Sequence, residues 1–203
     1  AIAETCRLVF PIVPSANFRE MMQDLSPHLR PYHFLIHGTK GFDLTGDTER
    51  QILPSQVHTL SQVIRQESVV VRVGCLSGPN LAAEIMDGQP AATVIGSRFD
   101  EVINLGKMVL QSPRFHVFGT HDIMGAELAG ALKNAFAIGS GILDGMGLGK
   151  NMQALLITRG LTEMIYFGRA IGATPHAFLG TAGIGDLVAT ATSEKSRNFT
   201  FGR

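Results

Sequence analysis

The feature that most constrains the fold is a change of pattern near residue 119. Before it, short runs rich in β-branched residues alternate with segments of helical periodicity. After it, strand signals fade, and residues 123–191 form long apolar stretches rich in Ala and Gly. Alternating strands and helices are typical of a doubly wound, largely parallel sheet, whereas continuous helical periodicity indicates an all-α unit. We therefore predict an α/β part, residues 1–118, followed by an all-α C-terminal domain, residues 119–203.

The same pattern predicts the individual elements. Strands are expected at residues 7–13, 33–39, 69–76, 91–95 and 114–118. Helices are expected at residues 16–25, 81–86, 99–111, 123–144 and 152–171. Ser15 is positioned to cap the first of these helices. Residues 43–68 are polar, with a helix expected only at 56–66, and residues 178–192 show no clear period.

Charge and composition exclude several classes of protein. The chain has 17 basic and 17 acidic residues and no net charge, which predicts neither a nucleic-acid partner nor binding to an anionic membrane. It has no uncharged apolar run of about 18 residues, so no membrane span is expected. Cys6 and Cys75 lack metal-ligand or redox spacing, which predicts two buried thiols in a reducing compartment. The histidines show no metal-ligand spacing either, so no metal site is expected.

One lysine stands out in the second part of the chain. Lys133 is the only charged residue between Leu128 and Leu143, in a segment of small and apolar residues. Because desolvating an ammonium is costly, its head either reaches water along an apolar surface or lies buried beside a partner. In the second case burial lowers its pKa, and the lysine becomes a candidate acid or base near neutral pH. The helical pattern leaves both alternatives open.

A candidate counter-charge lies further along the chain. Asp186 is the only acidic residue between Met164 and Ser193, and it follows the Gly-rich residues 181–185. Glycines allow the backbone to approach a ligand or a neighbouring element closely. Asp186 is therefore either the partner of Lys133 or the N-cap of a helix.

Three further segments have the chemistry of anion binding. Ser196, Arg197 and Asn198 place a guanidinium between two small polar side chains, which suits a phosphate, although an exposed polar turn has the same composition. Lys40 follows the second predicted strand, and residues 76–80 follow the third and precede a helix. Open α/β sheets bind ligands at the carboxyl ends of their strands, and helix N-termini attract anions. A surface lysine and a purely structural turn remain the alternatives.

Together and in this order, these segments resemble the bacterial type of the NAD(P)-dependent glycerol-3-phosphate dehydrogenase family. The resemblance runs from about residue 7 to the last residue. The blocks that carry it are Gly38-Thr39-Lys40-Gly41, Leu76-Ser77-Gly78-Pro79-Asn80-Leu81-Ala82-Ala83-Glu84, Glu127-Leu128-Ala129-Gly130-Ala131-Leu132-Lys133-Asn134-Ala135, Gly141-Ile142-Leu143-Asp144-Gly145, Ile157-Thr158-Arg159-Gly160-Leu161-Thr162-Glu163-Met164, Gly183-Ile184-Gly185-Asp186-Leu187 and Ser196-Arg197-Asn198. The Gly-Ala-Leu-Lys-Asn block, with Gly-Asp-Leu and Ser-Arg-Asn after it, is the most specific part.

The resemblance implies an oxidoreductase that interconverts sn-glycerol 3-phosphate and dihydroxyacetone phosphate, with NAD or NADP as cofactor. It implies a small-molecule substrate, a cytoplasmic location and a supply of glycerol 3-phosphate for phospholipid synthesis. In structural terms it implies a partial Rossmann-type domain followed by a truncated helical catalytic domain. The sequence leaves open the choice between NAD and NADP, feedback regulation and a possible homodimer.

The family's site residues fall on specific positions of this chain. Lys133 corresponds to the catalytic proton acceptor for the C2 hydroxyl and also to a substrate ligand. The other implied substrate ligands are Lys40, Gly78, Asn80, Asp186, Ser196, Arg197 and Asn198. The implied cofactor contacts are Lys40, Ala82 and Arg197.

The chain departs from the family pattern at several places. Asn80 occupies a position that is usually Ser or Thr; its amide is larger but can still donate a hydrogen bond. The segment between Gly41 and Leu76 is longer than usual, which predicts an inserted or extended surface helix. The Gly-x-Gly-x-x-Gly loop and the stretch that follows Arg203 in the family are absent, so we expect residues to be missing at both ends.

Two other functions are compatible with parts of the pattern. A dehydrogenase of similar build that acts on another hydroxy acid would share the fold, but the clamp of Ser196, Arg197 and Asn198 favours a phosphorylated substrate. A non-catalytic dimerisation or regulatory module would not need Lys133 and Asp186 inside apolar stretches.

Overall fold

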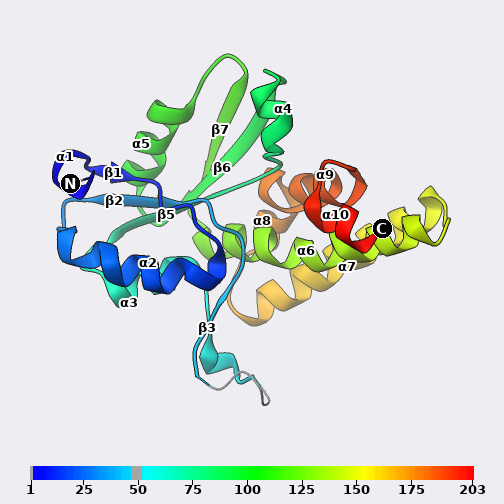
Figure 1. The fold of residues 1–203 in the computed structure, drawn as a ribbon, viewed down its shortest axis with the longest axis horizontal. Coiled ribbons are helices and arrows are strands. Elements are labelled where there is room, and N and C mark those ends of the chain that lie inside the picture. Colours follow the sequence, from blue (N-terminus) through cyan, green and yellow to red (C-terminus); the bar gives the residue numbers. More distant parts are fainter. Residues whose placement is uncertain (1, 47–51) are drawn as a thin grey trace.

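The computed structural model describes residues 2–46 and 52–203. Its main body is a five-stranded sheet with the strand order β1-β2-β5-β6-β7 (Figure 1). In that order the strands span Leu8–Val9, Phe34–His37, Arg72–Ser77, Ala91–Ser97 and Phe115–Thr120. Neighbouring strands run parallel except for β5 and β6, which are antiparallel. The predicted largely parallel sheet is confirmed.

Helices cover both faces of this sheet. Side chains alternate between the two faces along each strand, so apolar strands present side chains that need burial on both faces. Leu35 of β2 belongs to the core under α2 (Phe18–Leu25) and α3 (Leu60–Glu67). Phe34 and Ile36 belong to a second core under α5 (Asp100–Leu110). Figure 1 shows α2 and α3 on one side of the sheet and α5 on the other. This two-sided cover is the predicted doubly wound arrangement, in which interior strands are apolar on both faces.

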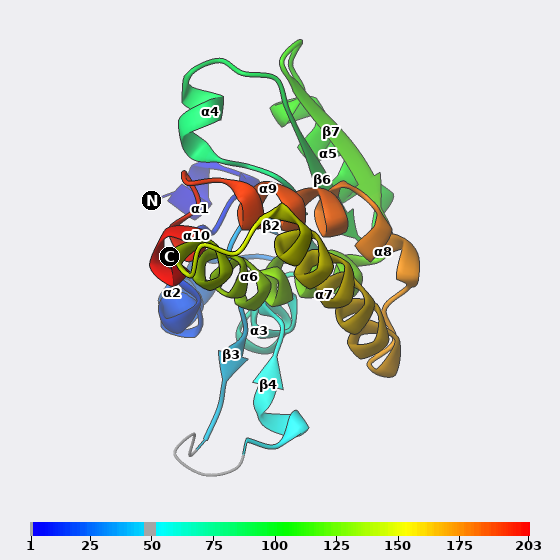
Figure 2. The ribbon, with the colours of Figure 1, turned by 90° about the vertical axis from the view of Figure 1, so that its right-hand side faces the viewer.

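The second part of the chain is helical, and α6 (Ile123–Gly145) is its central element. Asp122 caps this helix, since its Oδ1 accepts a hydrogen bond from Gly125 N at 2.8 Å. Around α6 pack α7 (Lys150–Ala170), α8 (Pro175–Leu179), α9 (Asp186–Thr192) and α10 (Arg197–Gly202) (Figure 2). The Gly-rich run Thr181–Gly185, which showed no clear period in the sequence, is a π-helical turn that leads into α9.

Shorter elements connect these layers. They are α1 (Ile2–Thr5), α4 (Ala82–Met86) and the 3₁₀ turns Ser15–Asn17, Ser26–His28 and Pro54–Gln56. The sequence did not predict α1 or α10, because four to six residues are too few to show a helical period.

The start of the sheet differs from the prediction. The first strand is only Leu8–Val9, because Pro11 and Pro14 follow it and proline has no amide hydrogen to donate to a neighbouring strand. The expected Ser15 cap is wrong: Ser15 begins the 3₁₀ turn, and α2 starts only at Phe18 with no side-chain cap.

The polar segment after Lys40 begins as an arm and not as the predicted surface helix; the helix within this segment is α3. β3 (Asp43–Leu44) and β4 (Val57–His58) pair in antiparallel fashion, and Figure 2 shows them projecting away from the sheet. Residues 47–51 lie outside the described part of the chain. The helix expected at 56–66 starts at Leu60, because Thr59 and Gln62 form a capping box in which Thr59 N donates to Gln62 Oε1 at 2.8 Å.

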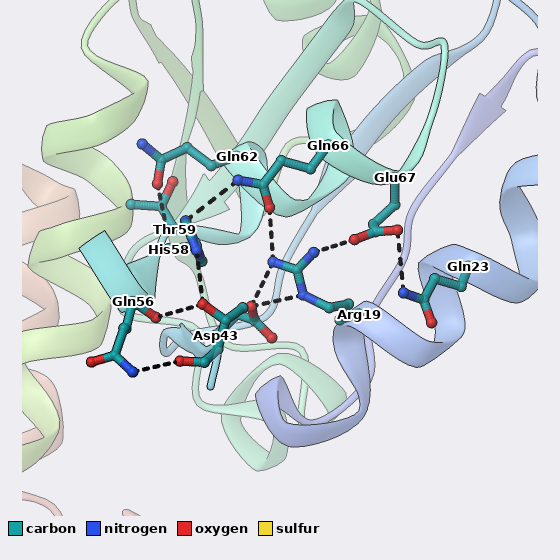
Figure 3. A network of polar contacts seen from close by, with 10 residues as sticks. Arg19, Gln23, Asp43, Gln56, His58, Thr59, Gln62, Gln66 and Glu67 are labelled. Atoms are coloured by element: carbon teal, nitrogen blue, oxygen red, sulfur yellow. Dashed lines mark hydrogen bonds and ion pairs between the residues drawn. The ribbon is translucent and has the colours of Figure 1, made fainter. Parts of the chain in front are cut away.

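Arg19 of α2 holds the base of this arm (Figure 3). Its guanidinium donates to Asp43 Oδ2 from Nε at 2.9 Å and from Nη2 at 2.7 Å, and it also pairs with Glu67 of α3. A second bond from Nη2 reaches Gln66 Oε1 at 2.8 Å. The segment that connects β2 to the arm is thereby fixed to the helical layer on one face of the sheet.

The cysteines divide into two environments. Cys75 is buried, as predicted, and burial raises the pKa of its thiol well above the usual value. Cys6 is exposed, which corrects the prediction, because it lies in the short link between α1 and β1 rather than in the core.

Within residues 2–46 and 52–203, no helix is long and apolar enough to cross a membrane, and no three His, Cys, Asp or Glu residues form a metal-binding group.

The packing of α10 on α6 generates a stability prediction. A Cβ added at Gly141 would overlap the Phe199 carbonyl oxygen and lie 2.8 Å from Arg203 N, both of which are backbone atoms. Gly141→Ala is therefore expected to destabilise the protein by about 1–3 kcal/mol in a urea titration, as overpacking does. Gly139→Ala, on the same helix, meets only the flexible Leu156 side chain at 3.3 Å and serves as the control. Equal midpoints for the two variants would contradict this view of the contact.

Candidate active site

A cleft of about 980 Å³ opens where the sheet meets the helical part. One wall consists of the segments that follow β1 and β2, residues 12–15 and 38–40, and another of residues 80–83 at the start of α4. The helical part contributes Lys133, Asn134, Asp186, Thr190, Lys195, Ser196, Arg197, Asn198 and Phe201. This position, at the carboxyl ends of parallel strands, is where open α/β sheets bind ligands, and the volume suits a small-molecule site.

Lys133 and Asp186 form a buried ion pair in this cleft. Lys133 is 4% exposed and Asp186 is 1% exposed, and the ammonium donates to Asp186 Oδ1 at 2.6 Å. Lys133 also donates to the hydroxyl of Thr190, one helical turn beyond Asp186 on α9. The alternative in which the Lys133 head reaches water is thus wrong, because the head is enclosed between α6 and α9.

Lys40 approaches the same carboxylate from the sheet side. Its ammonium donates to Asp186 Oδ2 at 2.5 Å and to the Gly78 carbonyl at 3.0 Å. Gly78 has φ +146°, and a Cβ there would lie 3.2 Å from the Ala92 carbonyl oxygen, so glycine suits this turn. Asp186 therefore holds two lysines, one on each of its oxygens.

The alternative role of Asp186 as a helix N-cap is wrong. Gly185 occupies the position before α9, and both Asp186 oxygens face lysines. The preceding π-helical turn is possible because Gly183 lies against the Phe178 carbonyl, where a Cβ would overlap the backbone. Such π-turns occur often at functional sites, because they redirect a side chain within a helical segment.

The environment changes the proton affinity of Lys133. Burial lowers its pKa most, and the positive charge of Lys40 lowers it further. The Asp186 carboxylate acts in the opposite direction, and the pKa settles at about 8 instead of 10.5. A lysine with this pKa can both accept and donate a proton close to neutral pH.

The three residues of the predicted phosphate clamp lie at the start of α10. The Ser196 hydroxyl caps the helix by accepting from Phe199 N at 3.3 Å, and Asn198 Nδ2 donates to Asn134 Oδ1 at 2.8 Å. Arg197 is exposed, lines the cleft, and forms no hydrogen bond or ion pair with another residue that the structure describes. Its guanidinium is thus available to a ligand, and the segment is a helix start rather than a plain polar turn.

The remaining predicted positions lie on the sheet side of the cleft. Asn80 and Ala82 line it, whereas Gly78 contributes only through its carbonyl to Lys40. Asn80 Nδ2 donates to Thr93 Oγ1 at 3.0 Å. The other atom of this amide, Oδ1, is a buried acceptor without a partner in the described residues. An unpaired buried acceptor is costly unless a ligand satisfies it.

Sequence reasoning missed several residues of this site. Thr190 and Asn134 carried no signal beyond their spacing, four residues after Asp186 and one after Lys133. Glu127 begins the sequence block that contains Lys133 but faces away from the cleft, toward His37 and Ser61. These pairs join residues far apart in the chain, which only the fold brings together.

A dinucleotide-type sheet followed by a helical domain, with a lysine and a carboxylate at their junction, is typical of two-domain nicotinamide-dependent dehydrogenases. Residues 1–103 match the family described as NAD-dependent glycerol-3-phosphate dehydrogenase N-terminus, and residues 122–203 match the corresponding C-terminus. The chain belongs to the NAD-dependent glycerol-3-phosphate dehydrogenase family.

Individual relatives agree with this assignment. The chain is 42% identical, over 98% of its length, to the glycerol-3-phosphate dehydrogenase [NAD(P)+] of Saccharophagus degradans, of which it covers 52%. It superposes with a TM-score of 0.88 and 35% identity on the crystal structure of a glycerol-3-phosphate dehydrogenase from Coxiella burnetii, covering 98% of this chain and 58% of that one. A Dunaliella salina structure gives the same TM-score at 25% identity, covering 100% of this chain and 34% of that chain. The chain thus spans about half the length of the curated relatives it matches.

Because Lys40 and Lys133 share the Asp186 carboxylate, removing Lys40 and removing the Asp186 charge are expected to shift the Lys133 pKa in opposite directions. Lys40→Met removes a positive charge beside Lys133 and is expected to raise the Lys133 pKa above about 8. Asp186→Asn removes the stabilising negative charge and is expected to lower it below about 8. The pH dependence of amine labelling at Lys133, followed by mass spectrometry, measures both shifts. Lys150→Met, on the exposed start of α7, is the control, and shifts of the same sign in the two test variants would refute the arrangement.

Proposed function

We propose that the protein is an NAD(P)-dependent oxidoreductase that interconverts sn-glycerol 3-phosphate and dihydroxyacetone phosphate. The observation that carries this proposal is the buried Lys133, paired with Asp186 in the cleft and adjusted to a pKa of about 8. Near pH 7 about a tenth of such a lysine is neutral, compared with fewer than about one in a thousand for an ordinary lysine. Both protonation states that reversible alcohol oxidation requires are therefore accessible.

In this proposal Lys133 exchanges the proton of the substrate C2 hydroxyl. Neutral Lys133 accepts it when glycerol 3-phosphate is oxidised, and its ammonium donates it to the carbonyl oxygen of dihydroxyacetone phosphate in the reverse direction. Asp186 orients Lys133 and, through its other oxygen, Lys40, so that two positive groups face the oxygen at which negative charge develops. General acid/base catalysis of this kind contributes roughly a hundred- to ten-thousand-fold.

The residues at the strand ends fit the reactive end of a dinucleotide. The cleft is bordered by the small or apolar residues 12–14 and 38–39 and by Ala82, which leave room for a flat ring beside Lys133. We assign Lys40, Ala82 and Arg197 to cofactor contact, with either NAD or NADP. A nicotinamide held by these residues would supply or take up the hydride of the reaction.

Substrate phosphate recognition is assigned to the segment that begins α10. Arg197 offers a planar fork of donors without a protein partner in the described residues, and Ser196 and Asn198 flank it. On the sheet side we assign Lys40 and Asn80 to the substrate, and Gly78 through the carbonyl that holds Lys40. The unpaired Oδ1 of Asn80 suits a substrate hydroxyl. A turnover assay that compares dihydroxyacetone phosphate with unphosphorylated keto acids separates this function from that of a related hydroxy-acid dehydrogenase.

The wider setting of the protein follows from the same proposal. We assign residues 1–118 to the dinucleotide-binding part and residues 119–203 to the catalytic part, with the junction between β7 and α6. The product glycerol 3-phosphate would serve phospholipid synthesis in the cytoplasm, with a homodimer as the proposed assembly. Size-exclusion chromatography with light scattering measures that last point.

Lys133→Ala tests the catalytic assignment. The variant lacks the proton acceptor, so turnover in a coupled NADH assay of the intact protein is expected to fall at least about a hundredfold, in line with the loss of a general base. Circular dichroism checks that the helical content is retained. Activity above about a tenth of the unmodified protein would exclude the role.

Arg197→Lys tests the phosphate assignment. Lysine keeps the charge but loses the planar fork that pairs two phosphate oxygens, so KM for dihydroxyacetone phosphate is expected to rise about tenfold. The penalty is expected to be smaller for an analogue without phosphate, because that ligand never uses the fork. An unchanged KM, or equal losses for both ligands, would identify Arg197 as a cofactor or surface residue instead.

A further inference from the structure

A second buried carboxylate lies behind the cleft, on the same helix as Lys133. Glu127 of α6 has a side chain that is 4% exposed, and its Oε1 accepts from His37 Nε2 at 2.9 Å and from Ser61 N at 2.8 Å. Its Oε2 accepts from Ser61 Oγ at 2.6 Å. None of these three residues lines the cleft, so the proposed chemistry does not use them.

Glu127 is ionised in this setting. Burial by itself would raise its pKa, but the hydrogen bonds and charge offered by His37, together with those from Ser61, hold the pKa below its usual value. Ser61 is the second residue of α3, so its amide is one of the donors that a helix start leaves without an intrahelical partner. A carboxylate at that position is further stabilised by the helix dipole.

His37 completes the contact as a hydrogen-bond donor. Its Nε2 faces the carboxylate and therefore carries the proton, while its buried Nδ1 finds no partner among the described residues. The Phe18 ring meets the His37 ring edge-on. The contact thus consists of one carboxylate and three donors.

The contacts of Glu127 and of Asp186 both involve α6 and the end of β2 or the residues that follow it. His37 ends β2 and Lys40 follows it by three residues, while Glu127 and Lys133 are six residues apart on α6. Midway between them, Gly130 presents its bare Cα to Lys40: a Cβ there would lie 3.5 Å from Lys40 Cγ and 3.0 Å from Ser77 Oγ. Glu127 and Gly130 are neighbours on the helix surface, as are Gly130 and Lys133, so α6 contacts the end of β2 and the following residues over this stretch.

We propose that Glu127 is a positioning residue that fixes α6 against β2 and α3, and thereby sets Lys133 and Lys40 on the two oxygens of Asp186. Without it, His37 Nε2, Ser61 N and Ser61 Oγ become buried donors without a partner, and the contact must open or admit water. Of the polar contacts that link α6 to the end of β2 in this region, the one through Asp186 would then remain, and that is the contact that a substrate must enter.

Kinetics of the intact protein give the first test, and this part rests on the proposed function. Glu127→Ala is expected to lower kcat by about 10- to 100-fold with KM changed less than about threefold, since a displacement of about 1 Å can cost a hundredfold. Glu127→Gln keeps an oxygen for His37 and Ser61 N and is expected to restore kcat to within about threefold. Glu163→Ala, an exposed glutamate of α7, is the matched control and is expected to change neither constant.

A second readout does not depend on activity. Burial is the largest cause that lowers the Lys133 pKa, so loosening α6 in Glu127→Ala is expected to move the labelling pKa of Lys133 upward from about 8. Glu127→Gln and Glu163→Ala are expected to leave it in place. If the intact protein has no dehydrogenase activity, the proposed function fails while this measurement still decides the role of Glu127.

Two results would overturn the positioning role. One is an unchanged Lys133 pKa in Glu127→Ala; the other is a Glu127→Gln variant as impaired as Glu127→Ala. If Glu127→Ala does not fold, Ser61→Ala carries the test, because it removes the donor to Oε2 together with the hydroxyl contact to Thr59 and leaves the Glu127 carboxylate in place. It is expected to reduce kcat about two- to fivefold and to raise the Lys133 pKa slightly, and no change in either would also reject the proposal.

Discussion

The carboxylate of Asp186 is the interaction on which the site depends. Two ammonium groups, Lys40 from the sheet and Lys133 from α6, approach within hydrogen-bonding distance of its two oxygens. Each lysine would be costly to desolvate alone, and each would repel the other without the shared negative charge between them. Burial lowers the Lys133 pKa, and the carboxylate stabilises the fold against the cost of that burial. The carboxylate also links the sheet to the helical part at the point where a substrate would lie.

The sequence predicted the charged residues of this site better than their partners. Lys133 and Asp186 were detectable because a lone charge inside an apolar stretch needs a physical reason, and Lys40 because it follows a strand. Thr190 and Asn134 were not, because a threonine and an asparagine beside a helix carry no comparable penalty. The contact of Glu127 with His37 and Ser61 joins positions 90 and 66 residues apart, and no local pattern encodes such a pairing.

The fold shows the same division between local and non-local signals. Strands buried on both faces were readable as apolar runs, and α6 and α7 as long helical patterns, since each signal is repeated many times within one element. The arm after Lys40 was not, because each of its strands is two residues long and its position depends on Arg19, which lies in another element. The Gly-rich segment before Asp186 has no period because a π-turn interrupts the helix there.

The sequence block around Lys133 contains few residues with reactive side chains. Small residues on α6 explain why the block is nevertheless specific. Gly130 lets the stem of Lys40 lie against the helix, and Gly141 and Gly145 let the backbone of α10 do so, near Phe199 and Arg203. A larger side chain at any of these places would push Lys40 or α10 away from Lys133. The glycines therefore set the distances between the charged groups as directly as the hydrogen bonds do. The polar residues of the site can act together only because α6 is narrow where the sheet and α10 meet it.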